Sequence, residues 1–254
     1  MTDDNGWPHP AARPPTWATR VLAPNPGPMT LDGTNTWVLR GPDGAGVVVV
    51  DPGPADEGHL RRILALGPVS AVLITHTHPD HVAGLDRFVQ LAGLDPHRVG
   101  RVPDDPATIG LLVEPIATPG HTADSVSFVA RGLDGADPAV LTGDTVLGAG
   151  TAMVAWPDGD LTSYLDSLRR LARLGPLPVL PGHGPPRPDC AAATAAYLEH
   201  RLARLAQVQT AVDQGATTPT EVVGVVYPGL DPRLLPAAEL TVRAQLAHLA
   251  ATGH

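Results

Sequence analysis

Short apolar runs alternate along the chain with stretches that have the apolar spacing of helices. The apolar runs end in turns rich in glycine, proline or aspartate and are typical of strands; they cover residues 18–22, 34–39, 47–50, 71–74, 113–118, 125–130, 139–142 and 178–180. Apolar residues three and four apart predict helices over 57–66 and 160–175, and another that starts near Val82. Strands that alternate with helices predict an α/β fold. The sequence shows no internal repeat.

The last part of the chain lacks strand patterns and reads as helical. A proline-rich, stiff linker over 184–188 precedes a long predicted helix over 189–212. A capping-box pattern at 218–221 starts a second helix, and a third covers about 236–251. We therefore predict two parts, namely a main α/β domain over 1–185 and a helical, winged-helix-like region over 186–254.

The stretch AVLITHTHPDHV, residues 71–82, carries the strongest chemical signal. An apolar strand runs directly into three imidazoles and a carboxylate, which are nitrogen and oxygen ligands that suit zinc and similar divalent metals. His76 and His78 point the same way because side chains alternate along an extended chain. A proline then ends the strand, so Asp80 and His81 lie at the start of the next helix and are aimed differently. One short segment can thus hold two metal ions.

This H-x-H-x-D-H pattern resembles the metallo-β-lactamase-fold superfamily. There the pattern continues with a histidine, a bridging aspartate and a final histidine, each in a turn after a strand. His121 in TPGHT, Asp144 in LTGDT and His183 in LPGHG match these positions one by one. The resemblance implies a four-layer αββα sandwich with the ligands at one edge of its two sheets. We expect the two halves of the sandwich to join around residues 133–138.

The resemblance also divides the ligands between two metal ions. The expected sets are His76, His78 and His121 for the first ion, Asp80, His81 and His183 for the second, and Asp144 as the bridge. Zinc is the expected metal at both positions, and iron or manganese would also accept these ligands. Two metals can share a water and lower its pKa, which gives a hydroxide that attacks a carbonyl carbon or a phosphorus. Asp80 is expected to pass the proton to the leaving group, so Asp80 and Asp144 are the catalytic candidates.

A closer resemblance is to the β-lactamase-like protein 2 branch, on stretches such as PGPMTLDGTNTW, TPGHTADSVSF and LTGDTVLG. Members characterised for function include an endoribonuclease that acts on single strands, and fungal relatives that act as polyketide thioesterases. The resemblance implies a hydrolase for a small ester or thioester, or for the phosphodiesters of short single-stranded RNA. Two alternatives stay open, a glyoxalase II-like hydrolase of hydroxyacyl thioesters and a metal-stabilised binding protein without turnover.

Composition narrows the choice of partners. The chain has 254 residues, 43% of them hydrophobic, and its formal net charge of −9 argues against binding of double-stranded nucleic acid. It contains no lysine, which excludes lysine-based chemistry, and its one cysteine, Cys190, excludes an internal disulfide. Residues 1–17, including His9, show no signal-peptide pattern, and no apolar stretch is as long as a membrane span. We therefore expect a cytoplasmic protein without membrane contact.

Three residues near the predicted ligands are candidates for supporting roles. Asp51 follows the apolar strand 47–50 and is expected to accept a hydrogen bond from a ligand histidine, with a turn-forming role as the alternative. Asn35 and Ser125 lie in stretches that resemble the branch and are candidates for substrate contact, with packing as an equal alternative.

The long C-terminal helix is expected to contribute to the substrate site. Its predicted apolar stripe includes Leu202 and Val212, and His200 and Arg201 lie in its first half. We expect these two side chains to approach an anionic group of the substrate, with surface packing as the alternative. A homodimer is a further expectation for this helical region.

Overall fold

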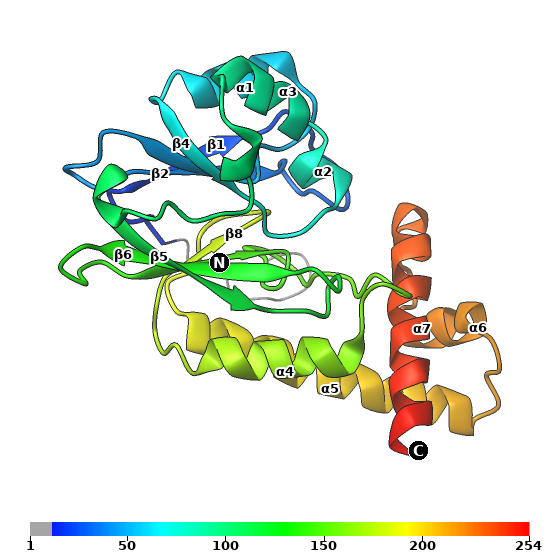
Figure 1. Ribbon diagram of the computed structural model, residues 1–254. Coiled ribbons are helices and arrows are strands. Elements are labelled where there is room, and N and C mark those ends of the chain that lie inside the picture. Colours follow the sequence, from blue (N-terminus) through cyan, green and yellow to red (C-terminus); the bar gives the residue numbers. More distant parts are fainter. Residues whose placement is uncertain (1–11, 254) are drawn as a thin grey trace.

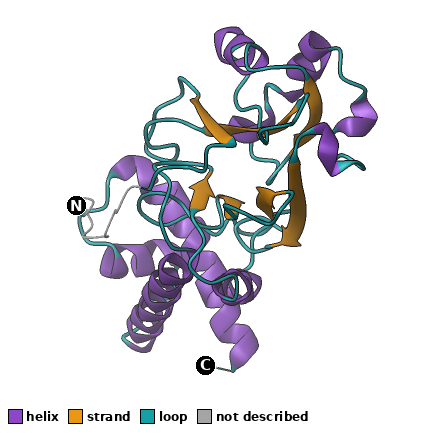
Figure 2. Cartoon of the chain, turned by 90° about the vertical axis from the view of Figure 1, so that its left-hand side faces the viewer, coloured by secondary structure: helices purple, strands orange, loops and turns teal. Residues whose placement is uncertain are grey.

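The computed structural model describes residues 12–253, in four layers (Figure 1). Two sheets pack face to face, and helices cover the outer face of each sheet, as Figure 2 also shows from the side. The outer helices are α1 (Glu57–Leu64) and α3 (Leu85–Ala92) on one face, and α4 (Leu161–Ala172) and α5 (Cys190–Asp213) on the other. The expected αββα sandwich is confirmed. His9 and His254 lie outside the described residues.

Each sheet has four strands and the same pattern of directions. The first contains β1 (Ala18–Leu22), β2 (Asn35–Leu39), β3 (Val47–Val50) and β4 (Val69–Leu73), and the second contains β5 (Leu111–Ala117), β6 (Val126–Gly132), β7 (Ala139–Gly143) and β8 (Val179–Pro181). The first two pairings in each sheet are antiparallel, whereas β3 pairs with β4, and β7 with β8, in parallel. Parallel neighbours end at the same sheet edge, so each sheet brings two loops together there.

The continuous apolar runs are explained by burial on both sheet faces. In β3, Val48 and Val50 pack in the core between the two sheets, while Val47 and Val49 pack against the helices of the first outer layer. Side chains alternate along a strand, so a strand covered on both sides is apolar at every position. A third cluster buries the outer face of the second sheet against α4 and α5.

The crossover between the two halves is not where we expected it. Residues 133–138 form the loop between β6 and β7, which pair antiparallel in one sheet. The chain instead crosses between β4 and β5, through α2 (Pro79–Val82), α3 and the short helices η1 (Pro96–Arg98) and η2 (Pro106–Thr108). A glycine-rich turn between two apolar runs fits a hairpin as well as a linker, so the pattern alone did not separate them.

The helix expected from Val82 onward is in fact two helices. α2 ends at Val82 and α3 starts at Leu85, with Gly84 between them. A Cβ atom at Gly84 would lie 2.7 Å from the carbonyl oxygen of Pro54, and the Gly84 amide donates to the carbonyl oxygen of Gly53. The chain therefore bends at Gly84, where it contacts the loop after β3. Because of this bend, α2 has a different direction from α3, and its first turn lies at the sheet edge.

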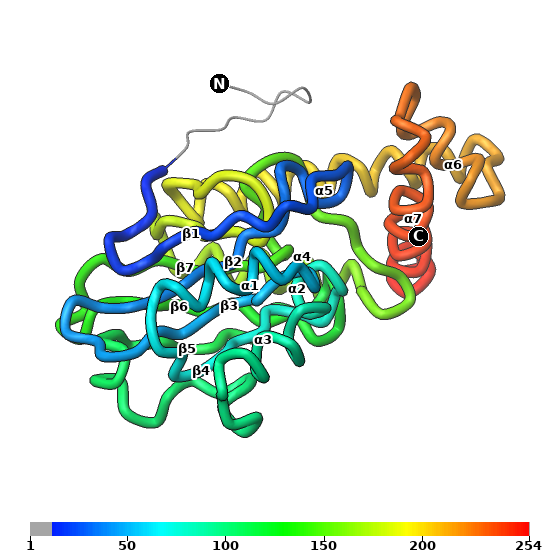
Figure 3. The backbone as a smooth tube through the Cα atoms, turned by 90° about the horizontal axis from the view of Figure 1, so that it is seen from above, coloured from blue at the N-terminus to red at the C-terminus, as the bar shows by residue number. Residues whose placement is uncertain are grey.

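The C-terminal helices pack against one another at one end of the sandwich (Figure 3). α5 is followed by α6 (Pro219–Val226), the short helix η3 (Pro232–Leu234) and α7 (Leu235–Thr252). The predicted capping box is present at the start of α6, where the Thr218 and Glu221 side chains both accept from backbone amides. Among the described residues, no helix combines the length and apolar character needed to cross a membrane.

Candidate metal centre

All seven predicted ligands meet at the edge where the parallel strands end. His76 and His78 follow β4, Asp80 and His81 lie on α2, and the loops after β5, β7 and β8 carry the other three. The side chains form two groups in which one donor atom from each residue lies within 4.8 Å of the others, His76, His78, His121 and Asp144, and Asp80, His81 and His183. The first group includes Asp144, which the resemblance implied as a bridge; the other members are those of the two expected sets.

Three histidine nitrogens converge in the first group. His78 Nδ1 lies 3.1 Å from His76 Nε2 and 3.0 Å from His121 Nε2. Nitrogens that bind a tetrahedral zinc at about 2.0–2.1 Å lie about 3.3 Å apart, close to these spacings. The three nitrogens therefore lie close enough together to bind one ion.

Hydrogen bonds at the Nδ1 atoms of His121 and His76 determine which ring nitrogen carries the lone pair that could bind a metal ion. His121 Nδ1 donates to the backbone carbonyl of Met153 at 2.7 Å, and a carbonyl can only accept, so His121 Nε2 carries the lone pair. His76 Nδ1 lies 3.0 Å from Thr75 Oγ1, whose own hydroxyl proton goes to Asp51 Oδ2. His76 therefore donates from Nδ1 and also presents Nε2.

The second group is held in the same way. His81 Nδ1 donates to Asp51 Oδ2 at 2.8 Å, and His183 Nδ1 donates to the backbone carbonyl of Gly33 at 3.2 Å. Their Nε2 atoms face each other at 3.3 Å, and Asp80 Oδ2 lies 3.1 Å from His183 Nε2. Outer hydrogen bonds of this kind orient metal-binding histidines and make them better ligands.

Asp144 lies between the two groups. Its Oδ1 is 3.5 Å from His81 Nε2, and its Oδ2 is 3.4 Å from His183 Nε2 and 3.8 Å from His121 Nε2. Oδ1 is buried and has no hydrogen-bond partner among the described residues. A buried carboxylate oxygen without a partner is costly, and a metal ion would satisfy it. The residues present therefore fit a metal centre.

Asp51 braces the loop that carries His76. It accepts from the Thr75 amide at 2.8 Å, from the Thr75 hydroxyl at 2.6 Å and from His81, and its side chain is buried. Its backbone is in the left-handed region with φ of 53°, which turns the carboxylate back toward the end of β4. Asp51 thus accepts a hydrogen bond from a ligand histidine, as expected, and its carboxylate also holds the loop at Thr75.

Charge is arranged differently in the two groups. Burial lowers the pKa of His76 to about 2, so its ring is neutral. Burial also opposes charge on His183, but the carboxylates of Asp144 and Asp80 outweigh it and raise the pKa of His183 to about 10. The pKa of His81 is likewise raised, against burial, by Asp144 and Asp51. Without metal, the second group thus holds protons that a metal ion has to displace.

Proton release on metal binding tests this arrangement. We expect zinc added to metal-free protein at pH 7 to release about two protons, from His81 and His183, because ligands bind metal only when deprotonated. Affinity at this group should therefore rise with pH up to about 10, where His183 loses its proton without help. Calorimetric titration in buffers of different ionisation enthalpy measures the number released. Identical heats in all buffers would contradict the assigned charges.

The two candidates for substrate contact near the ligands are both buried and support ligand loops. Asn35 Nδ2 donates to the carbonyls of Pro181 and Gly184, on either side of the His183 turn, at 3.0 and 2.8 Å. Ser125 Oγ lies 2.7 Å from Thr122 Oγ1 in the turn that follows His121. Loop support is therefore the role that their contacts show.

Arg201 lies inward, contrary to the expectation that it approaches a substrate. Its side chain is 3% exposed, it donates to the Ala152 carbonyl, and its guanidinium carbon lies 5.1 Å from the centre of the Tyr164 ring. The predicted stripe is wrong at Leu202 and Val212, which are exposed by 48% and 37%. The buried positions of α5 are instead Cys190, Ala193, Thr194, Tyr197, Arg201, Val208 and Ala211.

His200 is partly buried. Burial lowers its pKa to about 4, and the positive charges of Arg201 and Arg204 act in the same direction.

The sequence did not predict three other contacts of the ligands. The Thr34 hydroxyl donates to Asp80 Oδ2 at 3.1 Å, and the Met153 and Gly33 carbonyls accept from His121 and His183. Backbone carbonyls that accept from ligand histidines cannot be predicted from side-chain patterns, because every residue has a carbonyl.

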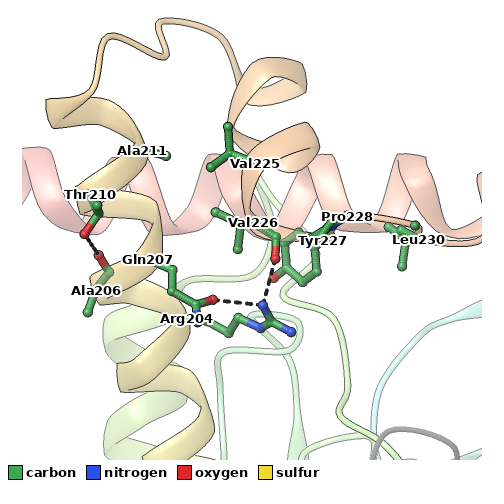
Figure 4. A pocket seen from close by; sticks show the side chains of 11 residues that line it. Arg204, Ala206, Gln207, Thr210, Ala211, Val225, Val226, Tyr227, Pro228 and Leu230 are labelled. Carbon is green, nitrogen blue, oxygen red and sulfur yellow. Dashed lines mark hydrogen bonds between the residues drawn. The ribbon is translucent and has the colours of Figure 1, made fainter.

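A large pocket lies elsewhere, in the C-terminal helical region. It has a volume of about 760 Å³ and lies between α5 and the end of α6, with Arg204, Val225 and Tyr227 among its lining residues (Figure 4). None of the seven ligands lines it. The metal centre is therefore identified by its donor atoms, and not by the size of a cavity.

Comparison with known proteins agrees with this fold. The family model described as "Metallo-beta-lactamase superfamily" matches residues 29–102 and 98–183, and the "Beta-lactamase associated winged helix domain" matches 218–254. The chain is 32% identical to a "Beta-lactamase-like protein 2 homolog" of Caenorhabditis elegans over 73% of this chain and 68% of the relative. A homologue of that name in Drosophila melanogaster is 30% identical over 92% and 88%. An "Atrochrysone carboxyl ACP thioesterase" of Aspergillus fumigatus is 35% identical over 65% and 55%.

Solved structures share the architecture. A beta-lactamase domain protein from Burkholderia ambifaria covers 100% of this chain and 90% of its own with a TM-score of 0.74, at 23% identity. A metallo-beta-lactamase family protein from Thermus thermophilus covers 93% and 94% with a TM-score of 0.67, at 23% identity. The family match spans all seven ligands. With its converging histidines and aspartates, this chain belongs to the metallo-β-lactamase superfamily, as a metal-dependent hydrolase.

Proposed function

We propose that this protein is a dinuclear zinc hydrolase that cleaves a small ester or thioester. The observation that carries the proposal is Asp144, whose two carboxylate oxygens face nitrogen donors of both ligand groups. One carboxylate shared by two groups suits a pair of ions more than one. Bound ions would supply an activated water at neutral pH and positive charge for the substrate's carbonyl oxygen.

The chain's own residues set the geometry for this reaction. The ligand rings are held from outside by Asp51, Thr75 and the backbone, so little reorganisation is needed when the substrate arrives. Asp80 is 27% exposed at its side chain, more than the 11% of Asp144. Asp80 is therefore the carboxylate better placed to move a proton between the site and a leaving group.

The charges beside the site favour a small acyl substrate over RNA. Two exposed carboxylates, Asp124 and Asp158, lie beside the turn after His121, where Asp158 Oδ2 accepts from the Ala123 amide. They would repel successive phosphates. The relative whose name states an acyl-carrier thioesterase supports the same substrate class. Single-stranded RNA, which the β-lactamase-like protein 2 resemblance also suggested, becomes the competing outcome of the test.

A substrate screen with zinc-loaded protein tests this function. We expect acyl thioesters to be cleaved with a kcat/KM at least about a hundredfold above that for phosphodiesters or single-stranded RNA, with rates that change little between 50 and 200 mM salt. RNA binding loses affinity steeply over that range because counterions are released. Protein treated with a chelator is the control. RNA cleavage that exceeds thioester cleavage and falls with salt would overturn the proposed substrate.

A further inference from the structure

The segment between β7 and α4 lies between the metal ligands and the C-terminal helices. On one side, the Met153 carbonyl accepts from His121 Nδ1 at 2.7 Å and the Ala155 amide donates to the His121 carbonyl at 3.0 Å. Earlier in the segment, the Gly148 amide donates to the His183 carbonyl at 2.8 Å. Two ligand residues therefore depend on this segment for hydrogen bonds.

The other side of the same segment is bound by the C-terminal helices. Tyr197 of α5 accepts from the Leu147 amide at 2.9 Å and donates to the Gly150 carbonyl at 2.7 Å. Arg201 of α5 donates to the Ala152 carbonyl, and Thr241 of α7 accepts from the Val154 amide at 3.2 Å. Tyr197, Arg201 and Thr241 are all buried.

The two sets of contacts alternate along the segment. Positions 150, 152 and 154 bond to the helices, whereas positions 153 and 155 bond to His121. The Met153 carbonyl and the Val154 amide belong to one planar peptide group, so the contact with Thr241 on one side constrains the contact with His121 on the other. A shift of the helices would therefore move the Met153 carbonyl that orients His121.

Arg201 is an unusual residue for a purely structural contact. Among the described residues no carboxylate pairs with its guanidinium, and its Nε has no hydrogen-bond partner. A buried charge without a counter-ion is costly, so its contacts with the Ala152 carbonyl and the Tyr164 ring have to hold it in place. Tyr164 in turn donates to the Thr145 carbonyl, next to Asp144, at 2.7 Å.

We propose that the C-terminal helices are a positioning element for the metal centre, in which Arg201 and Thr241 set the orientation of His121 through the Met153 carbonyl. This inference rests on the proposed two-metal function. It predicts that the Arg201 and Thr241 contacts control affinity at the group of His76, His78 and His121. The group of Asp80, His81 and His183 should stay nearly unchanged in variants of these two residues, because Tyr197 holds the part of the segment that bonds to His183.

Arg204 offers a matched control on the same helix. Like Arg201, it donates to a backbone carbonyl, that of Val226 at 2.8 Å, and lies over a tyrosine, with 4.7 Å to the centre of the Tyr227 ring (Figure 4). These contacts stay within the C-terminal helical region. Arg204→Met therefore removes the same kind of contact without touching the segment that bonds to His121.

Titration of metal-free protein with Zn²⁺ against a competing chelator, and with Co²⁺ to follow its visible spectrum, tests the inference. His121→Ala and His183→Ala assign the two binding steps. We expect Arg201→Met to weaken the His121 step about 10- to 100-fold and change its Co²⁺ spectrum, with the His183 step within about threefold of wild type. Arg201→Lys should restore most of the affinity because an ammonium can still donate to Ala152.

Thr241→Val decides the outcome if Arg201→Met does not fold, and it should weaken the same step. Wild-type affinities in both Arg201→Met and Thr241→Val, or an equal loss in Arg204→Met, would overturn the inference. A wild-type protein that binds fewer than two ions would instead overturn the proposed function, so the two failures can be told apart.

Discussion

We expect Asp144→Ala to remove hydrolysis while the two sheets stay folded. The Asp144 carboxylate faces nitrogens of both ligand groups and makes no contribution to the apolar clusters of the sandwich. In the proposed two-metal site, Asp144 would be the ligand that both ions share, and a lost electrostatic contact of this kind costs about 10²–10³ in kcat or more. Zinc content should fall below two equivalents, which elemental analysis measures beside kcat/KM.

Asp166→Ala is the control for this substitution. It removes the same charge from α4, where Asp166 is exposed and pairs with Arg169. Its activity and zinc content should equal those of the wild type. Hydrolysis by Asp144→Ala within tenfold of wild type would show that Asp144 does not bridge two ions.

Gly120→Ala should cause a large loss of stability. A Cβ atom there would lie 2.2 Å from Tyr164 Cα, and the backbone has φ of +137°. The methyl group would push α4 away from the turn that carries His121, at a cost of about 3–5 kcal/mol from overpacking and backbone strain together. Thermal unfolding of the metal-free protein measures the loss.

Gly175→Ala separates crowding from backbone strain. Gly175 also has a left-handed backbone, with φ of +78°, but no atom lies within 4 Å of an added Cβ. We expect this variant to lose only about 1–2 kcal/mol, the usual cost of a side chain in that conformation. Equal losses in the two variants would mean that the close approach of α4 to Gly120 does not matter.

The resemblance to a known superfamily supplied the expected ligands, and apolar runs in the sequence mark the strands that four of them follow. Turns with glycine end the apolar runs before His121, Asp144 and His183, whereas the run 71–74 leads directly into the segment of His76. Parallel pairing brings such ends together, so the sequence contains the position of the site as well as its chemistry. The crossover was misplaced because a hairpin loop and a linker have similar composition, and only the pairing of β6 with β7 distinguishes them.

The supports of the site were harder to predict, since they act through contacts that periodicity does not encode. Arg201 occupies a core position of α5, four residues after Tyr197, while the apolar Leu202 beside it is exposed. A hydrophobic pattern assigns these two residues the other way round. The guanidinium is accepted in the interior only because a carbonyl and an aromatic ring of distant segments meet it there.

The two sheets have the same number of strands and the same order of strand directions, so the two halves of the chain have equivalent topology. Asp51 follows β3 as Asp144 follows β7, and His76 follows β4 as His183 follows β8. The sequence shows no repeat, so the correspondence is one of backbone topology. Each ligand group draws donors from both halves, His76 and His121 in one case and His81 and His183 in the other. Bound metal ions would therefore link the two halves of the sandwich and stabilise their association, so metal binding should raise the free energy of unfolding.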